Sequence, residues 1–214
     1  MKVKICGITN LADARYATAL GADYLGFILH PESPRYVEAR TAAEIIEWVY
    51  GATTVGVFVD ADADTVNSQV AEAGFDMVQL HGDETIETCA RIEQPIIKAF
   101  QARERDTFDD LARRMEPYAE TVDFFLVDTY DASLRGGTGR TFDWTLASRL
   151  AGAFPLFLAG GLRPENVVRA VETVSPAGVD VSSGVESEPG RKDFARLDAF
   201  FDALSRSGLI ENPA

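Results

Sequence analysis

Strand-like and helix-like segments alternate along this chain, and this alternation constrains its fold more than any other feature. Short runs rich in β-branched and aromatic residues predict strands, and between them apolar residues recur at helical spacing. We expect strands near residues 3–6, 24–29, 54–59, 77–80, 96–99, 124–127, 156–159 and 179–181. We expect helices over residues 11–20, 41–50, 62–73, 83–92, 107–118, 142–150, 164–173 and 193–205.

The strand segments show almost no polar alternation, which indicates burial on both faces, as in a parallel α/β sheet. Eight such units predict a single-domain (β/α)₈ (TIM) barrel over residues 1–207, followed by a frayed tail over residues 208–214. A doubly wound open sheet is the alternative, with its ligand at one switch point. The barrel is favoured because small or polar residues follow nearly every strand: Gly7, Pro31, Asp60, His81, Gln101, Thr129, Gly160 and Ser182.

Length and composition limit the classes of function. The 214 residues fit one barrel, and no apolar run reaches the ~18 residues that a membrane span needs, so we expect a soluble cytoplasmic protein. Two cysteines, Cys6 and Cys89, are too few for a disulfide framework and are expected to be reduced.

The net charge of −14 argues against nucleic acid or an anionic membrane as partner. Only four of the 20 basic residues are lysines. Ordinary solubility explains an acidic surface, and adaptation to high salt is the sharper hypothesis.

Two turns near the end of the chain predict a phosphate site. Gly160-Gly161 follows one strand, Ser182-Ser183-Gly184 follows the next, and Pro164 stands at an expected first helical position between them. Small residues let a ligand approach the backbone, and free amides at a helix start suit a phosphate. Paired glycines that only permit a turn are the alternative for each motif alone.

Three side chains at the expected barrel mouth are candidates for chemistry. Cys6 ends the first strand, where nearby amides could lower the thiol pKa enough for it to act as a base; a small buried hydrophobic residue is the alternative. Asp128 leaves an apolar strand, whose desolvation favours a protonated general acid. Arg35, in a proline-flanked loop, could grip a carboxylate or remain a solvated surface residue.

Several polar residues lie close to the expected barrel mouth. Asp60, Gln79 and His81 are placed at its rim, and Asp180 lies beside the phosphate turns. Lys98 points either into the mouth or toward a salt bridge, and Asp83 is expected to cap the next helix. The only other histidine is His30, so no metal site is predicted. The glycine-rich loop 136–139 is equally consistent with a phosphate-binding turn and with a flexible lid.

Motifs in seven of the eight units resemble phosphoribosylanthranilate isomerases, the tryptophan-pathway enzymes with a (β/α)₈ fold. They run in order from Lys4 to Asp193, and Arg140 departs from them by replacing a frequent lysine. The motifs are K-I-C-G-I-T-N, S-P-R, V-G-V-F-V-D, M-V-Q-L-H-G-D-E, V-D-T with G-G-T-G-R-T-F-D-W, L-A-G-G-L-R-P-E-N-V and G-V-D-V-S-S-G-V-E.

The resemblance implies a cofactor-free Amadori rearrangement of N-(5-phosphoribosyl)anthranilate, a small-molecule substrate. It implies that Arg35 binds the anthranilate carboxylate and that backbone at Gly160, Gly161, Ser182, Ser183 and Gly184 holds the phosphate, with the two anchors at opposite ends of the substrate. We assign the general acid to Asp128 and the general base to Cys6. A histidine-pathway isomerase, which pairs two aspartates, and a non-catalytic phosphoribosyl-binding module are the alternatives. The oligomeric state, monomer or homodimer, stays open.

Overall fold

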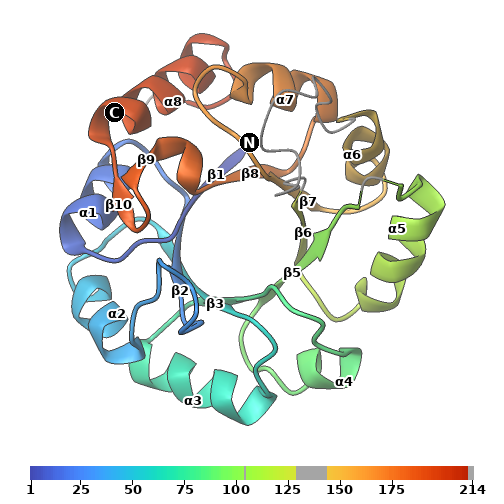
Figure 1. Cartoon of the computed structure of the whole chain (residues 1–214), viewed down its shortest axis with the longest axis horizontal. Helices are drawn as coiled ribbons and strands as arrows, with labels where there is room; N and C mark the ends of the chain where they lie inside the picture. The colour runs from blue at the N-terminus through green and yellow to red at the C-terminus, as the bar shows by residue number, and fades with distance from the viewer. Residues whose placement is uncertain (104, 129–143, 212–214) are drawn as a thin grey trace.

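The computed structural model describes residues 1–103, 105–128 and 144–211, in which strands and helices alternate as the sequence predicts. The barrel strands are β1 (Lys2–Cys6), β2 (Tyr24–Ile28), β3 (Thr53–Phe58), β4 (Met77–Leu80), β5 (Ile96–Gln101), β6 (Phe124–Asp128), β7 (Leu156–Ala159) and β8 (Gly178–Val181). The α-helices are α1 (Leu11–Ala19), α2 (Ala39–Ile46), α3 (Ala63–Ala73), α4 (Ile86–Cys89), α5 (Phe108–Met115), α6 (Trp144–Ala151), α7 (Val167–Val174) and α8 (Phe194–Arg206). They form a ring around the strands (Figure 1).

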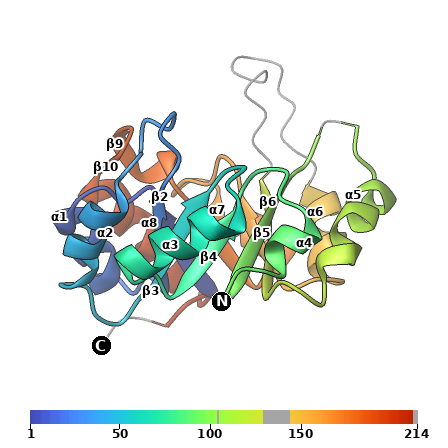
Figure 2. The same ribbon diagram turned by 90° about the horizontal axis from the view of Figure 1, so that it is seen from below.

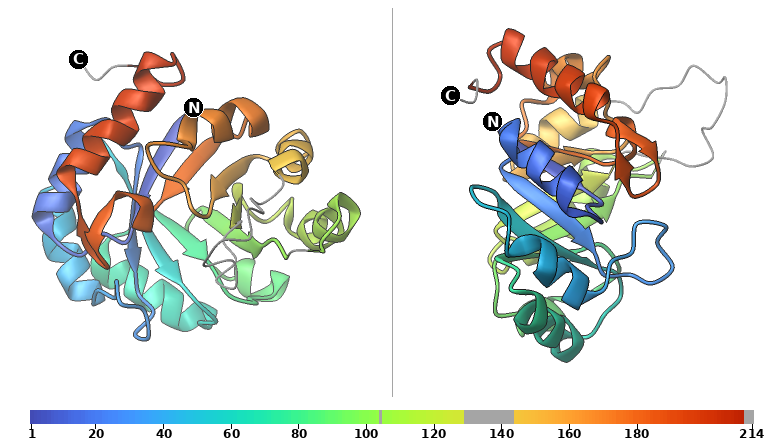
Figure 3. Two further views of the ribbon diagram at one scale, coloured as in Figure 1. Left: turned by 45° about the horizontal axis from the view of Figure 1, so that its top comes forward. Right: turned by 90° about the vertical axis from the view of Figure 1, so that its left-hand side faces the viewer.

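The sheet closes on itself, which confirms the (β/α)₈ barrel and rules out the open doubly wound sheet. All neighbouring strands are parallel in the order β1 to β8, and β8 returns to β1 with Val3 opposite Val179. Helix α8 packs against α1 beside this seam (Figure 3). Closure therefore brings the carboxyl ends of the first and last strands side by side, although they lie about 175 residues apart in sequence.

Alternation along each strand divides the core into two parts. The larger cluster lies between the strands and the surrounding helices. A smaller cluster occupies the barrel interior and includes Val55, Ile97, Leu126 and Phe157. Side chains at every second position of a strand share a face. The side chains that point into the barrel therefore include the polar residues at the carboxyl ends of the strands.

Helix starts follow local capping chemistry, with one correction. Asn10 caps α1 by accepting a hydrogen bond from the backbone amide of Asp13 at 2.9 Å. Asp83 does not cap the fourth helix, because that helix begins later and Thr85 caps it. The buried Glu84 carboxylate accepts hydrogen bonds from the amides of Asp60 and Gly82, which holds the segment before Thr85 in a loop.

Two further features differ from the sequence prediction. An antiparallel hairpin of β9 (Glu186–Glu188) and β10 (Arg191–Lys192) lies between β8 and α8, after a short 3₁₀ helix, η3 (Ser183–Val185). The hairpin lies at the edge of the barrel away from the N-terminus (Figure 2). In the segment expected to be frayed, Leu209 and Ile210 are half-buried against the core, and residues 212–214 lie outside the described part.

No helix in the described part of the chain is long and apolar enough to span a membrane.

Candidate active site

A cavity of about 360 Å³ opens at the carboxyl ends of the barrel strands. It brings together every residue that the sequence assigned to catalysis or to substrate binding. Its lining comprises Cys6, Arg35, Gln79, His81, Asp128, Gly160, Gly161, Asp180, Ser182, Ser183 and Gly184, with the apolar Ile28, Val57, Ala159, Leu162 and Val181 between them. A thiol from the first strand and a carboxyl group from the sixth therefore line the same open cavity.

Cys6 is 6% exposed and ends β1 on the inner wall of the barrel. Its thiol pKa lies above the ordinary value, because burial outweighs the attraction of the Lys4 and Lys192 ammonium groups. The sequence argument for a lowered pKa is therefore wrong: it considered the amides at a strand end and not the depth of the site. The neighbouring strand makes room for the thiol, since a Cβ on Gly26 would lie 2.8 Å from Sγ.

Directly below Cys6 lies a buried ion pair that the sequence did not reveal. Lys4 Nζ is 2.9 Å from Asp180 Oδ1, and the Lys4 side chain is completely buried. Burial lowers the pKa of Lys4, but Asp180 and the Cys6 thiol outweigh it, so the net shift is upward. Lys4 therefore stays charged, and a positive charge lies close to the thiol in a low-dielectric setting.

Asp128 and His81 lie together on the opposite side of the cavity from β1. His81 Nε2 is 3.8 Å from Asp128 Oδ2, and Gln79 Nε2 is 2.8 Å from His81 Nδ1. Burial lowers the pKa of His81, an effect that the Asp128 carboxylate opposes. The Asp128 side chain is 28% exposed, so its carboxyl group is partly desolvated. Gln79 is completely buried, and its Oε1 has no partner among the described residues.

The loops after β7 and β8 touch and form a cradle of backbone. Gly160 and Gly161 have φ values of 93° and 66°, which an L side chain rarely adopts. A Cβ on Gly184 would lie 1.8 Å from the carbonyl oxygen of Leu162, so only glycine fits at this crossing. The 3₁₀ helix η3 begins at Ser183, in the loop after β8. Pro164, in contrast, lies in the turn before α7, which begins at Val167.

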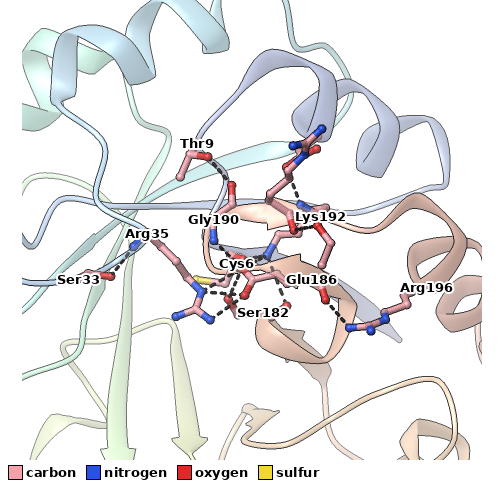
Figure 4. A network of polar contacts seen from close by, with 12 residues as sticks. Cys6, Thr9, Ser33, Arg35, Ser182, Glu186, Gly190, Lys192 and Arg196 are labelled. Carbon is pink, nitrogen blue, oxygen red and sulfur yellow. Dashed lines mark hydrogen bonds and ion pairs between the residues drawn. The ribbon is translucent and has the colours of Figure 1, made fainter.

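Arg35 lies at the cavity rim, and its partner was not anticipated (Figure 4). Its Nε is 2.9 Å from Glu186 Oε1 and its Nη2 is 2.7 Å from Glu186 Oε2. Ser182 Oγ lies 3.5 Å from the same Glu186 Oε1. Closure of the barrel therefore places Arg35 beside the loop after β8.

A second recess, of about 510 Å³, adjoins the first over the ends of β3 to β6 and shares His81 and Asp128 with it. Lys98 borders it and forms the salt bridge that was one of its two expected roles, with Nζ 2.8 Å from Glu84 Oε2. Lys98 alternates with the inward residues Ile97 and Ala99, so it points out of the barrel toward the loop after β4.

The structure does not describe three features named from the sequence: the loop 136–139, Thr129 and Arg140. Within the described ranges, no group of three or more His, Cys, Asp or Glu side chains is arranged to hold a metal ion.

Comparison with known proteins agrees with this geometry. A family model described as N-(5'phosphoribosyl)anthranilate (PRA) isomerase matches residues 3–203. The N-(5'-phosphoribosyl)anthranilate isomerase of Geobacter sulfurreducens is 47% identical over 201 residues, which are 94% of this chain and 96% of that protein.

Solved structures give the same result. The phosphoribosyl anthranilate isomerase of Thermotoga maritima superimposes with a TM-score of 0.86 at 39% identity, over 96% of this chain and 99% of that one. A phosphoribosyl anthranilate isomerase in complex with reduced 1-(o-carboxyphenylamino)-1-deoxyribulose 5-phosphate gives a TM-score of 0.83 at 37% identity, with the same coverage. With a family model that spans nearly its whole length and relatives of this similarity, the chain belongs to the N-(5'-phosphoribosyl)anthranilate isomerase family.

Proposed function

We propose that this protein is an isomerase of tryptophan biosynthesis that converts N-(5-phosphoribosyl)anthranilate into 1-(2-carboxyphenylamino)-1-deoxyribulose 5-phosphate. The observation that carries the proposal is the shared cavity, in which a thiol, a carboxyl group and a backbone cradle surround one substrate-sized space. The rearrangement moves a hydrogen between two carbons of the sugar, so it needs an acid and a base but no external oxidant.

Asp128 supplies the acid. It gives its proton to the ribose ring oxygen as the bond between that oxygen and C1 breaks, which leaves an open-chain iminium ion. The carboxyl group suits this role because it stands at the end of β6, partly shielded and within the cavity. Its neighbour His81 keeps one ring nitrogen directed at it and the other at Gln79, which fixes the orientation of the pair.

Cys6 supplies the base. It removes the C2 proton of the iminium ion to give an enolamine. The enolamine then tautomerises to the ketone product by gaining a proton at C1 and losing the proton of its C2 hydroxyl group. Burial favours the neutral thiol, whereas Lys4 and Lys192 favour the thiolate. Because these two ammonium groups are already fixed beside the sulfur, solvent does not have to reorganise around the thiolate charge.

The two ends of the substrate are held by different parts of the site. The phosphate fits the cradle, where the backbone amides of Gly161, Ser183 and Gly184 have no acceptor among the described residues. Arg35 takes the carboxylate of the aromatic ring. With both ends of the substrate anchored, its ribose carbons are held between Asp128 and Cys6.

Turnover of freshly prepared phosphoribosylanthranilate, followed by loss of its fluorescence, tests the proposal. We expect Cys6→Ser and Asp128→Asn each to lower kcat by at least about a hundredfold, the usual contribution of general acid–base catalysis, with unchanged circular dichroism. Near-normal kcat in the first variant removes the base assignment, and a change in KM alone in the second makes Asp128 a binding residue. If the wild-type protein binds the substrate but does not turn it over, the protein is a non-catalytic phosphoribosyl-binding module instead.

We also infer a cytoplasmic location, which the biosynthetic family and the two free cysteines support.

A further inference from the structure

The hairpin after β8 places a buried carboxylate between two cations of the site. Glu186, the first residue of β9, is 5% exposed. It accepts hydrogen bonds from Nε and Nη2 along one edge of the Arg35 guanidinium group and lies 2.9 Å from Lys192 Nζ. Burial raises the pKa of Glu186, but the hydrogen bond from Arg35 and the charge of Lys192 outweigh it, so the net shift is downward. Glu186 is therefore ionised and held on both sides.

This carboxylate leaves the other edge of Arg35 available. A guanidinium group has five N–H donors, and Glu186 engages Nε and Nη2 from the side. Nη1 has no partner among the described residues, and Arg35 borders the cavity. The edge formed by Nη1 and Nη2 can therefore accept a second carboxylate in bidentate geometry.

The rest of the Arg35 side chain is held as well. A Cβ on Gly7, where φ is 78°, would lie 2.7 Å from Arg35 Cδ, so the arginine stem packs directly on the loop after β1. The Arg35 backbone amide donates to Ser33 Oγ at 3.1 Å. With its stem packed and one edge paired, the guanidinium group loses little further conformational entropy when a ligand binds.

Lys192 links the Glu186 carboxylate to Cys6, the residue that carries the catalytic thiol. Its side chain is completely buried, and Nζ donates to the backbone carbonyl oxygen of Cys6 at 2.5 Å as well as to Glu186. Two cations and one anion leave a net positive charge of one in the cluster, which matches the single charge of a ligand carboxylate. Figure 4 shows Arg35, Glu186, Lys192 and Cys6 in this contiguous arrangement.

We propose that Glu186 is a positioning residue that presents the free edge of Arg35 to the carboxylate on the aromatic ring of the substrate. The inference rests on the proposed function, because it names the group that fixes specificity for a 2-carboxyphenyl substituent. Glu186 itself touches no substrate atom in this scheme. It acts by fixing the plane of the guanidinium group, and Lys192 holds Glu186 in turn.

Calorimetric binding of two compounds to the whole protein tests this role without requiring turnover. One is reduced 1-(o-carboxyphenylamino)-1-deoxyribulose 5-phosphate, and the other is the same compound without its carboxyl group. In Glu186→Gln we expect affinity for the first to fall about tenfold, equivalent to about 1.4 kcal/mol, and affinity for the second to stay unchanged within a factor of about two.

Glu188→Gln is the matched control, because it removes the same charge from the same hairpin at a side chain that is 66% exposed. We expect it to bind both compounds as the wild type does. If Glu186→Gln weakens the binding of both compounds by the same factor, its defect is purely structural and the proposal is overturned. Unchanged or tighter binding of the first compound overturns it too.

If Glu186→Gln fails to fold, Glu186→Asp is measured in the same way, since it keeps the charge but shortens the reach to Arg35. The same selective loss supports the proposal, and an equal effect on both compounds contradicts it. A wild-type protein that neither binds the first compound nor turns over the substrate contradicts the proposed function instead.

Discussion

At the scale of single residues, the site depends on where its few lysines are. Three of the four lysines have side chains that are at most 3% exposed, and each pairs with a buried carboxylate: Lys4 with Asp180, Lys98 with Glu84 and Lys192 with Glu186. Two of these ammonium groups, on Lys4 and Lys192, act on the Cys6 thiol. Buried pairs of this kind stabilise little by themselves, so their placement around the thiol points to an electrostatic role.

The charge on Asp180 sets one testable property of Cys6. Its negative charge disfavours the thiolate, so it raises the thiol pKa in addition to the larger effect of burial. Asp180→Asn removes that charge and keeps the shape of the side chain, so the thiol pKa should fall. The rate of iodoacetamide alkylation against pH, in a Cys89→Ser background, should then rise at lower pH than in the parent.

Asp202→Asn is the control for this measurement, because Asp202 is exposed on α8 and pairs with Arg206. It should leave the alkylation profile unchanged. A profile for Asp180→Asn that stays in place, or moves to higher pH, contradicts the assignment of the charge effect. In the wild type, kcat/KM should keep rising with pH above neutrality, because the raised pKa keeps the thiol protonated there.

At the scale of elements, the phosphate cradle depends on the close crossing of two loops. A methyl group at Gly184 meets the Leu162 carbonyl oxygen, so Gly184→Ala must push the loops after β7 and β8 apart. We expect KM for the substrate to rise at least about tenfold, because the amides lose their common geometry, and the melting temperature to fall. Steady-state kinetics and thermal unfolding measure both effects.

Gly74→Ala separates this steric effect from an ordinary glycine substitution. Gly74 caps α3 with φ at 77° and has open space around its Cα, outside the cavity. Its replacement should cost about 1 kcal/mol through the left-handed backbone conformation and leave KM unchanged. Equal KM values in Gly184→Ala and the wild type show that the loop crossing does not hold the phosphate.

The sequence predicts the elements well because the alternation of strands and helices is strong and local. Strands β4 and β7 begin and end at the predicted residues, and the other barrel strands differ by one or two residues at their ends. Helix ends are predicted less well: α2 ends four residues before the predicted end, and α7 begins three residues after the predicted start. At α4, a buried side chain from the leading loop, Glu84, overrides a local capping signal at Asp83. The hairpin of β9 and β10 is too short to show a periodic pattern.

The site is predicted less completely, because its electrostatics depend on contacts between distant parts of the chain. Residues at the strand ends identify the cavity lining, since every parallel strand delivers its carboxyl end to one face. The partners Lys4–Asp180 and Arg35–Glu186 are 176 and 151 residues apart, and no spacing rule connects them. Burial of Cys6 likewise depends on the finished barrel, which explains why the sign of its pKa shift was missed.

At the scale of the whole molecule, the outer surface is strongly acidic. The net charge is −14, and only one lysine, Lys2, has an exposed side chain, at 55%. Arginines therefore supply almost all of the positive charge at the surface. Mutual repulsion of like charges destabilises a compact state, and dissolved salt screens it over a Debye length of about 8 Å at 0.15 M. Adaptation to high salt remains our hypothesis for this surface.

Stability should therefore rise with KCl concentration from low salt to the molar range. The triple variant Glu47→Lys, Glu72→Lys and Glu120→Lys reverses three exposed charges outside the cavity. In low salt its melting temperature should lie above that of the wild type, by about 2–4 °C for each kcal/mol of repulsion removed, and the difference should shrink as KCl is added. Glutamine at the same three positions should give a smaller gain, because it removes charge without reversing it. If wild type and variant melt together in low salt, surface repulsion is negligible, and an unchanged wild-type melting temperature across the KCl series leaves ordinary solubility as the reason for the acidic surface.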